Sequence, residues 1–409
     1  MKQVVLGGLS HFLSHPVFLL RTLKCIVGLL LLSTSSFSSA VVENVHFAGF
    51  ALAGDAAHSE RAFPVTTMLL EERDARGIPL LESALWDALT RDGSRYPNLV
   101  LNPDIAASHT SPDALALAVV LDWENASTES LRGTTKLVLD LHAQIMIFDF
   151  ATRQVLGSWP VAVQLIDVID SHSVGQSQIE SRFRQMYYGS DLDKTLFAAT
   201  AEKLAQIEVR RSRGNYIRVV SVTLEDNARA ALAEAGEQED IFEARVANSF
   251  GKYLSENQRV HYIPYTKGAA VGAKMAARFA SGEVYQLELP TPDYRVHLTV
   301  RGFKKVELGN SSLETAWAYG SYMHVKIQDY DESTTYLSAP FKFGAVKKVP
   351  AGGVVPDDWA AYQESLFSLI NGITNQMSDP DRAWLESRSE GRSVATQLMH
   401  VQEIIERCR

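Results

Sequence analysis

The stretch Lys136 to Pro160, KLVLDLHAQIMIFDFATRQVLGSWP, is matched in pattern by Ala316 to Pro340, AWAYGSYMHVKIQDYDESTTYLSAP, 180 positions further along the chain. In both stretches alternate positions carry mostly apolar side chains, which is the period of a β-strand with one buried face. These positions are Leu137, Leu139, Leu141, Ala143, Ile145 and Ile147, and Trp317, Tyr319, Ser321, Met323, Val325 and Ile327. Each run then reaches an Asp followed by an aromatic residue, a polar break and a second β-like run. The sequence therefore predicts the same antiparallel hairpin twice.

The residues around each hairpin repeat one order of elements, with somewhat different offsets. The order is strand, helix, short strand, strand, hairpin and closing helix. In the first copy we expect these at Val45–Leu52, Ile78–Leu89, Asn98–Leu101, Ala114–Asp122, the hairpin and Leu196–Ile207; in the second at Tyr216–Leu224, Phe242–Leu254, Val260–Pro264, Tyr294–Val300, the hairpin and Tyr362–Ile373. Helices on one face of a mixed sheet satisfy the two-layer rule for a domain.

The predicted fold class is therefore α+β, with two tandem copies of a mixed-sheet domain and helices packed on one face. Chance similarity between two unrelated α+β domains is the alternative. Along the chain we expect a signal peptide at 1–40, the first repeat at 41–208, a linker at 209–215, the second repeat at 216–377 and a C-terminal extension at 378–409 that carries an amphipathic helix.

The first 40 residues have the organisation of a secretory signal peptide. Arg21 and Lys24 precede an apolar run from Cys25 to Leu32, and small residues at Ser38 and Ala40 fit a signal-peptidase site. The apolar run is shorter than the roughly 20 residues that span a bilayer. We expect cleavage after Ala40, a periplasmic location and no membrane-spanning segment afterwards. An uncleaved N-terminal anchor is the alternative.

Charge and cysteine content restrict the partners of the exported chain. The net charge of −9 becomes −12 once Lys2, Arg21 and Lys24 are removed. Such a balance argues against nucleic acid as a partner, because phosphates would be repelled. Only Cys408 remains after cleavage, so that no internal disulfide can form.

The hairpin signature resembles a small periplasmic α+β domain. It rests on Ile145 to Leu156 and Val325 to Tyr336, where a long alternating strand is followed by an Asp-aromatic turn, a returning strand and a closing helix. That domain is shared by curli-secretion lipoproteins, penicillin-binding-protein activator lipoproteins and the N-terminal domain of the Tol translocation protein. The resemblance implies a non-enzymatic part of an envelope machine. This chain departs from it by lacking a lipidation cysteine and by carrying two copies.

No catalytic, cofactor-binding or metal-binding motif is recognisable. Gly268 to Gly272 lacks the lysine and hydroxyl of a phosphate-binding loop, and neither a Gly-x-Ser-x-Gly elbow nor a His-Glu-x-x-His pair occurs. His142 and His324 alternate onto the face opposite the apolar ladder, where we expect half-exposed strand positions and not ligands. We predict no catalytic residue, no cofactor and no metal.

Two features suggest contacts with a partner. Aromatic residues, which are enriched at recognition surfaces, crowd the second hairpin; Tyr322 on its polar face and Tyr330 at its turn are the candidates. In the C-terminal extension, Leu398 and Ile405 belong to an apolar stripe at helical spacing. That stripe either packs on the second repeat or docks on another subunit or partner.

The leading prediction is a non-enzymatic periplasmic accessory or scaffold protein of a cell-envelope assembly, of the secretion, pilus, flagellar or peptidoglycan-synthesis type. It would act within an envelope protein complex, with a homo-oligomer as a further option. The alternative of another class is a periplasmic protein that binds a small molecule or glycan in the groove between the repeats. A deep groove with aromatic and a few convergent polar residues would favour it. A hydrolase with a site scattered through the chain is the third hypothesis.

Overall fold

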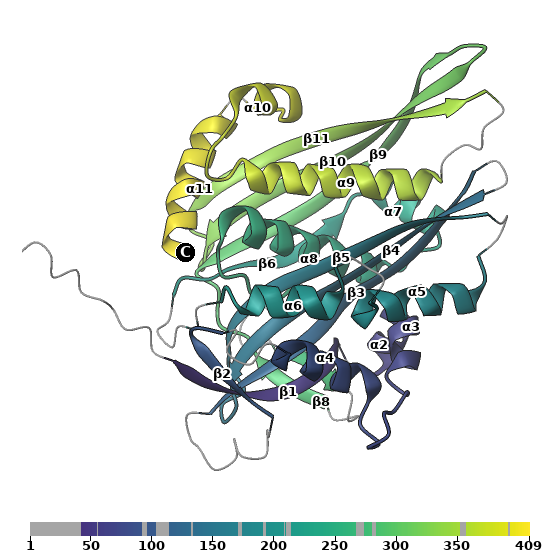
Figure 1. Ribbon diagram of the computed structural model, residues 1–409. Helices are drawn as coiled ribbons and strands as arrows, with labels where there is room; N and C mark the ends of the chain where they lie inside the picture. The colour runs from purple at the N-terminus through teal and green to yellow at the C-terminus, as the bar shows by residue number, and fades with distance from the viewer. Residues whose placement is uncertain are drawn as a thin grey trace, which may run out of the picture. The chain divides into compact units, whose positions relative to one another are not determined.

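Both halves of the chain contain a four-stranded unit with the same order of strands (Figure 1). The computed structural model describes residues 42–409 apart from 55, 92–95, 104–113, 132–133, 171–173, 191–193, 208, 210–213, 267–273, 280–283, 352–356 and 392. The predicted signal peptide, most of the predicted linker and the Gly268 to Gly272 stretch lie outside the described residues.

The elements follow the chain in this order. The first half contains β1 (Glu43–Ala53), α2 (Ala56–Ala62), α3 (Pro64–Leu69), α4 (Leu80–Thr90), β2 (Leu99–Asn102), β3 (Leu115–Leu131), β4 (Thr134–Asp149), β5 (Val155–Ile169), α5 (Gln176–Tyr188) and α6 (Leu196–Leu204). The second half contains β6 (Ile217–Leu224), α7 (Asp226–Glu234), α8 (Glu239–Gln258), β7 (Lys274–Phe279), β8 (Val284–Glu288), β9 (Tyr294–Asn310), β10 (Glu314–Asp329), β11 (Thr335–Pro350), α9 (Asp358–Asn375), α10 (Arg382–Arg388) and α11 (Val394–Cys408).

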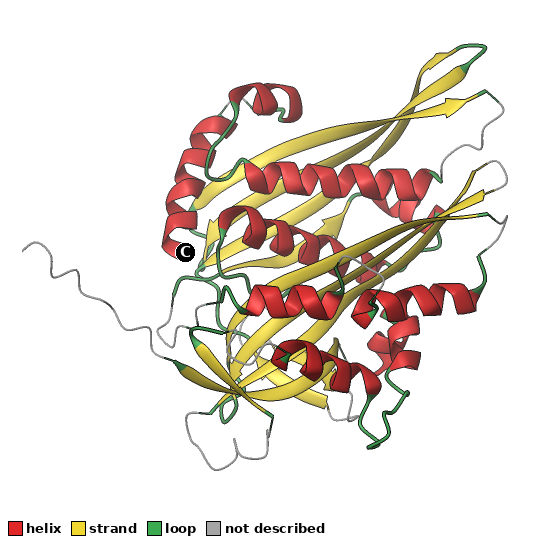
Figure 2. Cartoon of the chain, viewed as in Figure 1, coloured by secondary structure: helices red, strands yellow, loops and turns green. Residues whose placement is uncertain are grey.

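The two sheets confirm the predicted α+β class. The shared strand order is β5-β4-β3-β1 in the first half and β11-β10-β9-β6 in the second. Figure 2 shows the strands of both sheets in yellow and the helices in red. In each, the first strand pairs in parallel with its neighbour (β1 with β3, β6 with β9), whereas the following pairs are antiparallel. Both sheets are therefore mixed, and they follow the same path.

The register of the hairpins is also the same. Gln144 lies opposite Pro160, and His324 lies opposite Pro340, which is the same pair shifted by 180 positions. Each turn is closed by a hydrogen bond from the Asp backbone N–H to the carbonyl five residues on, at 2.9 Å from Asp149 and 3.2 Å from Asp329. The Asp carboxylate also accepts a backbone N–H of its own turn, from Thr152 at 2.7 Å or from Thr334 at 3.0 Å. The Asp of the repeated signature thus has a local role, because it fixes the turn that sets the register.

Helices cover the apolar face of each sheet. The Leu137 to Ile147 ladder packs with the buried faces of α4, α5 and α6. The Met323 to Ile327 ladder packs with α8, α9 and α11. Helix α9 begins at Asp357, whose carboxylate accepts the Trp359 N–H at 3.0 Å as a helix cap.

A hairpin from the second half completes the sheet of the first half. Strand β7 pairs antiparallel with β1, with Ala51 opposite Phe279, and β8 continues the sheet beyond β7. Residues within the predicted second repeat, 216–377, therefore belong to the first sheet. The two halves share backbone hydrogen bonds as well as side-chain contacts.

Several expected elements differ in the structure. The predicted short strand Val260–Pro264 is reduced to one bridge between Tyr262 and Ile217, which occupies the place that β2 takes beside β1. Strands β3 and β9 run well beyond the predicted Asp122 and Val300. The sequence pattern did not identify α5, α7, α10 or the β7–β8 hairpin. Among the described residues, no helix is long and apolar enough to cross a bilayer.

The close approach of α8 to Tyr262 gives a test of this packing. A Cβ atom added at Gly251 would lie 2.1 Å from two ring atoms of Tyr262, which is buried. We expect Gly251→Ala to lower the free energy of unfolding by about 1–3 kcal/mol, because the buried ring has to move. Urea denaturation measures this change. Gly309→Ala is the matched control, since its Cβ meets no atom within 4 Å; equal stability of the two variants would contradict the predicted contact.

Candidate functional site

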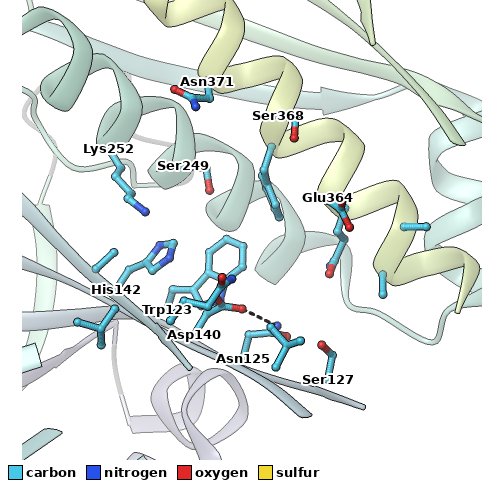
Figure 3. A pocket seen from close by; sticks show the side chains of 18 of the residues that line it. Trp123, Asn125, Ser127, Asp140, His142, Ser249, Lys252, Glu364, Ser368 and Asn371 are labelled. Carbon is cyan, nitrogen blue, oxygen red and sulfur yellow. Dashed lines mark hydrogen bonds between the residues drawn. The ribbon is translucent and has the colours of Figure 1, made fainter. Parts of the chain in front are cut away.

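A cleft of about 460 Å³ lies between the first sheet and helices α8 and α9 (Figure 3). Its floor is the face of β3, β4 and β5 that points away from α4, α5 and α6. The main polar and aromatic residues of the cleft are Trp123, Asn125, Asp140, His142 and Gln164 on the floor, and Ser249, Lys252, Tyr253, Glu364, Phe367, Ser368 and Asn371 on the helices. The volume falls in the range of about 300–1,000 Å³ that is usual for small-molecule sites.

A row of polar side chains crosses the floor from β3 to β5. Asp140 is in the middle, and its two carboxylate oxygens accept amide N–H groups from Asn125 at 3.2 Å and from Gln164 at 2.7 Å. The amide groups of Asn125 and Gln164 each keep a carbonyl oxygen with two lone pairs as an acceptor and one further N–H as a donor. The row therefore offers the cleft mainly hydrogen-bond acceptors.

Trp123 marks the deep end and joins the sheet to both helices. His142 stacks on its ring at 4.9 Å, the Arg245 guanidinium lies 4.7 Å from the ring centroid, and Phe367 meets it edge-on at 5.2 Å. Only 5% of Trp123 is exposed. Its indole is therefore occupied by its neighbours and is not an open stacking platform for a ligand.

A buried hydrogen-bonded chain lies behind this end. Ser158 donates to Gln144 at 2.8 Å, and Gln144 donates to Asp122 at 2.9 Å. Burial raises the pKa of Asp122 to about 6, although the Gln144 hydrogen bond and the Lys252 charge offset part of the rise. Burial lowers the pKa of His142 well below its usual range, and the positive charges of Lys252 and Arg245 lower it further. His142 is therefore a neutral imidazole at pH 7.

The cleft residues belong to one copy of the repeat. Both copies have a β-bulge at the same place, where the register shifts between Leu121 and Trp123 in β3 and opposite the Tyr322/Met323 step in β10. With the strands aligned on these bulges, the second copy has Gly320 and Gly344 at the positions of Asp140 and Gln164. The polar row is therefore not required by the fold.

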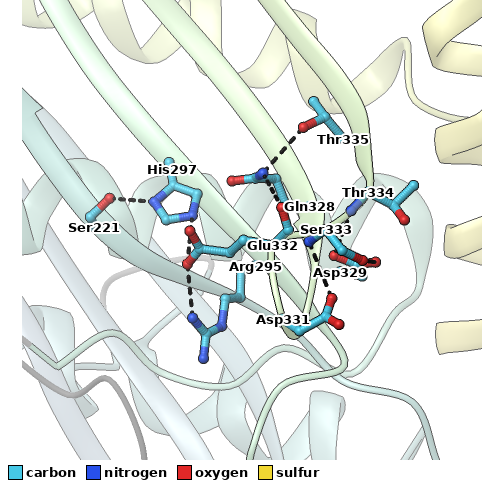
Figure 4. A network of polar contacts seen from close by, with 10 residues as sticks. All are labelled: Ser221, Arg295, His297, Gln328, Asp329, Asp331, Glu332, Ser333, Thr334 and Thr335. Carbon is cyan, nitrogen blue, oxygen red and sulfur yellow. Dashed lines mark hydrogen bonds and ion pairs between the residues drawn. The ribbon is translucent and has the colours of Figure 1, made fainter.

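A second polar cluster lies on the face of the second sheet that points away from its helices (Figure 4). Ser221 Oγ is 2.8 Å from His297 Nδ1, and His297 Nε2 is 3.8 Å from Glu332 Oε1. The residue types are those of a nucleophile, a base and an acid. However, the second distance exceeds a hydrogen bond, and Arg295 holds the Glu332 carboxylate at 2.8 Å. We interpret this cluster as a set of contacts that stabilises the turn between β10 and β11.

The predicted partner residues have different surroundings. Tyr330 is 42% exposed and its ring lies 4.9 Å from the Arg295 guanidinium, whereas Tyr322 is half-buried on the polar face as expected. Leu398 and Ile405 have no exposed surface and belong to the second core. These two residues are therefore not exposed for a partner: the apolar stripe of α11 packs on its own chain, against β11 and its neighbours, which is the first of the two options that the sequence left open.

Sequence reasoning placed His142 at a half-exposed strand position and missed the rest of the cleft. His142 is half-buried and lines the cleft, and His324 is half-buried with Nε2 3.3 Å from Ser338 Oγ. Asp140 and Gln164 occupy the outward positions of their strands, as solvent-exposed residues do. No local sequence signal therefore distinguishes these two cleft residues from ordinary surface residues. Within the described part of the chain, no three His, Cys, Asp or Glu side chains gather as a metal site.

The raised pKa of Asp122 predicts a pH-dependent stability difference. The unfolded chain loses this proton near pH 4 and the folded chain near pH 6, so that ionisation of Asp122 costs stability as the pH rises through this window. We expect the free energy of unfolding of Asp122→Asn, measured relative to that of the wild type, to be about 2 kcal/mol higher at pH 7.5 than at pH 4.5. Urea denaturation of both proteins at both pH values measures the gain.

Asp329→Asn is the control for this experiment. Hydrogen bonds, chiefly from the Thr334 backbone, lower the pKa of Asp329 to about 2, so that its stabilising effect is lost only below pH 4. Its stability difference from the wild type stays nearly constant between pH 4.5 and pH 7.5. A constant difference for Asp122→Asn as well would contradict the buried, protonated carboxyl.

Comparisons with known proteins yield no family. No protein-family model matches the chain, and no curated protein matches it. Among solved structures, a hypothetical protein from Chlamydia trachomatis aligns with a TM-score of 0.25 and 11% identity over 40% of this chain and 96% of that chain. A TM-score of this size does not establish a shared fold.

Proposed function

We propose that the chain is an exported accessory protein of the cell envelope that binds a small polar molecule in the cleft between its two sheets. The observation that carries the proposal is the cleft itself, which combines a suitable volume with the Asp140 row and the Lys252 ammonium. Pockets of this kind, with a few convergent polar groups beside aromatic side chains, are the usual sites of ligands.

The arrangement of these groups favours binding over catalysis. Both Asp140 oxygens already accept amide N–H groups, and His142 stacks on Trp123, so that neither is positioned as a free acid or base. General acid–base catalysis needs a group whose proton is within reach of a substrate. The same hydrogen bonds would hold a ligand-binding surface in a fixed geometry.

A scaffold role in an envelope assembly is the second candidate, and a specific observation supports it. The β-strands that extend past the predicted ends of the sheets carry exposed apolar side chains. On the strands these are Ile166 (56%), Val168 (58%), Val306 (40%), Leu308 (57%) and Val346 (55%), and the turn between β9 and β10 adds Leu313 (79%). Exposed apolar surface of this kind is typical of protein contact sites.

The binding proposal predicts a bound molecule. Full-length chain expressed in a bacterium with an outer membrane and purified without denaturation should carry one small molecule per chain, which native mass spectrometry detects. Ala162 lines the cleft floor, and Ala162→Phe should abolish retention because the ring fills the cleft. Ala318 lies on the face of the second sheet that points away from its helices, outside the cleft, so that Ala318→Phe should retain the molecule. Equal recovery from both variants, or none from the wild type, would contradict the proposal.

The proposed export predicts a new N-terminus. N-terminal sequencing of the protein from the periplasmic fraction should begin at Val41, because Ser38 and Ala40 fit the signal-peptidase site. Substitution of Ala40 by Tyr should block processing and leave the longer form on the membrane. A wild-type protein that keeps residues 1–40 would instead support the uncleaved anchor.

A further inference from the structure

One end of the cleft contains a lysine that forms no ion pair among the described residues. Lys252 on α8 lines the cleft, and its ammonium points toward His142 (Figure 3). Among the described residues it forms no ion pair, and its Nζ lies 5.1 Å from the centroid of the Tyr253 ring. His142 is neutral, and the Asp122 carboxylate, which interacts electrostatically with Lys252, is hydrogen-bonded to Gln144 behind this end, so that the Lys252 ammonium is the charge that lines the cleft here. A partly desolvated ammonium gains most from an anionic partner, since a charged hydrogen bond is stronger than a neutral one.

A hydrogen-bond donor lies at the same end. The indole Nε1 of Trp123 has no acceptor within the described residues, although 95% of the side chain is buried. Buried N–H groups are nearly always satisfied, and one that is not has to be explained. Because the indole nitrogen itself is buried, an internal water, and not a molecule in the cleft, would supply the missing acceptor.

The Asp140 row has the opposite character, although Lys136 and Lys347 also line the cleft. Asp140 has no cationic partner among the described residues, and with Asn125 and Gln164 it presents acceptor oxygens. Glu364 faces this row from α9, where it pairs with Lys347. Acceptors at this density require donors on the ligand, such as ammonium or hydroxyl groups.

The spacing of the two ends sets the length of the ligand. Asp140 and His142 are two residues apart on one face of β4, which corresponds to about 7 Å along a strand. We infer, on the basis of the proposed binding function, that the cleft takes a small molecule with one carboxylate at the Lys252 end and ammonium or hydroxyl donors about 7 Å away at the Asp140 end. A single lysine suits a monoanion better than a phosphate dianion, which usually has several cationic partners. Short peptides and uronic acids share this chemistry.

A panel of matched probes tests the inference on the full-length chain, with isothermal titration calorimetry as the readout. The probes are alanyl-alanine, its C-terminal amide, its N-acetyl form, glucuronate and glucose. We expect removal of the carboxylate, as in the amide or in glucose, to weaken binding about tenfold to a hundredfold. Binding of the dipeptide or of glucuronate then distinguishes a peptide from a sugar source.

Variants at Lys252 and Asp140 test which of these residues binds which group of the ligand. Lys252→Met should abolish the preference for the carboxylate, and Lys252→Arg should restore most of it, which separates loss of charge from loss of fold. Asp140→Asn should abolish the preference for the dipeptide over its N-acetyl form. Lys326→Met, on the opposite face of the second sheet, is the control and should behave as the wild type.

The inference is overturned if no carboxylate probe binds, or if Lys252→Met keeps the wild-type preference. That failure is distinct from failure of the proposed function. A neutral molecule retained by the wild type and lost in Ala162→Phe would keep the binding role while removing the ligand class.

Discussion

The packing around Trp123 is the contact on which the cleft depends. One indole from the first sheet touches Arg245 of α8 and Phe367 of α9, while His142 stacks on its other side. An aromatic pair contributes about 0.5–1.5 kcal/mol beyond its buried area, and a cation over a ring contributes a similar amount. These contacts hold two helices of the second half at a fixed height above β3, β4 and β5. The cleft then lies beside Trp123, in the space that these contacts keep open between the sheet and the two helices.

The β-bulge next to Trp123 explains why this residue faces the helices of the second half. An inserted residue changes the face to which the following side chains point. After the bulge at Asp122, Glu124 returns to the other face, where its carboxylate accepts the Val65 and Thr66 N–H groups at 2.8 Å each. One irregular residue in β3 therefore directs Trp123 toward the cleft and Glu124 toward α3. The chain has kept the same irregularity in β9.

Much of the fold was predictable because its signals are local. Period-two alternation located β4 and β10, and the Asp turn fixed their hairpins, so that the 180-position shift between the copies recurs in the bounds of both strands. The β7–β8 hairpin was not predictable, because its partner β1 lies more than 200 positions earlier and no local pattern encodes that pairing. The cleft was missed for a related reason. A polar residue at an outward strand position gives the same sequence pattern whether water or another helix covers it.

The two copies of the repeat also allow a comparison within one chain of a sheet with the polar row and a sheet without it. Covering the first sheet with α8 and α9 removes water from Asp122 and His142. Burying polar groups costs stability unless each finds a partner. At two of the aligned positions the second copy has only Gly320 and Gly344, and its hairpin still forms in the same register. The fold therefore tolerates a floor without the polar row. Because neither the hairpin nor its register needs Asp140 and Gln164, these two positions are free to vary without loss of the fold, which is what the proposed binding role requires of them.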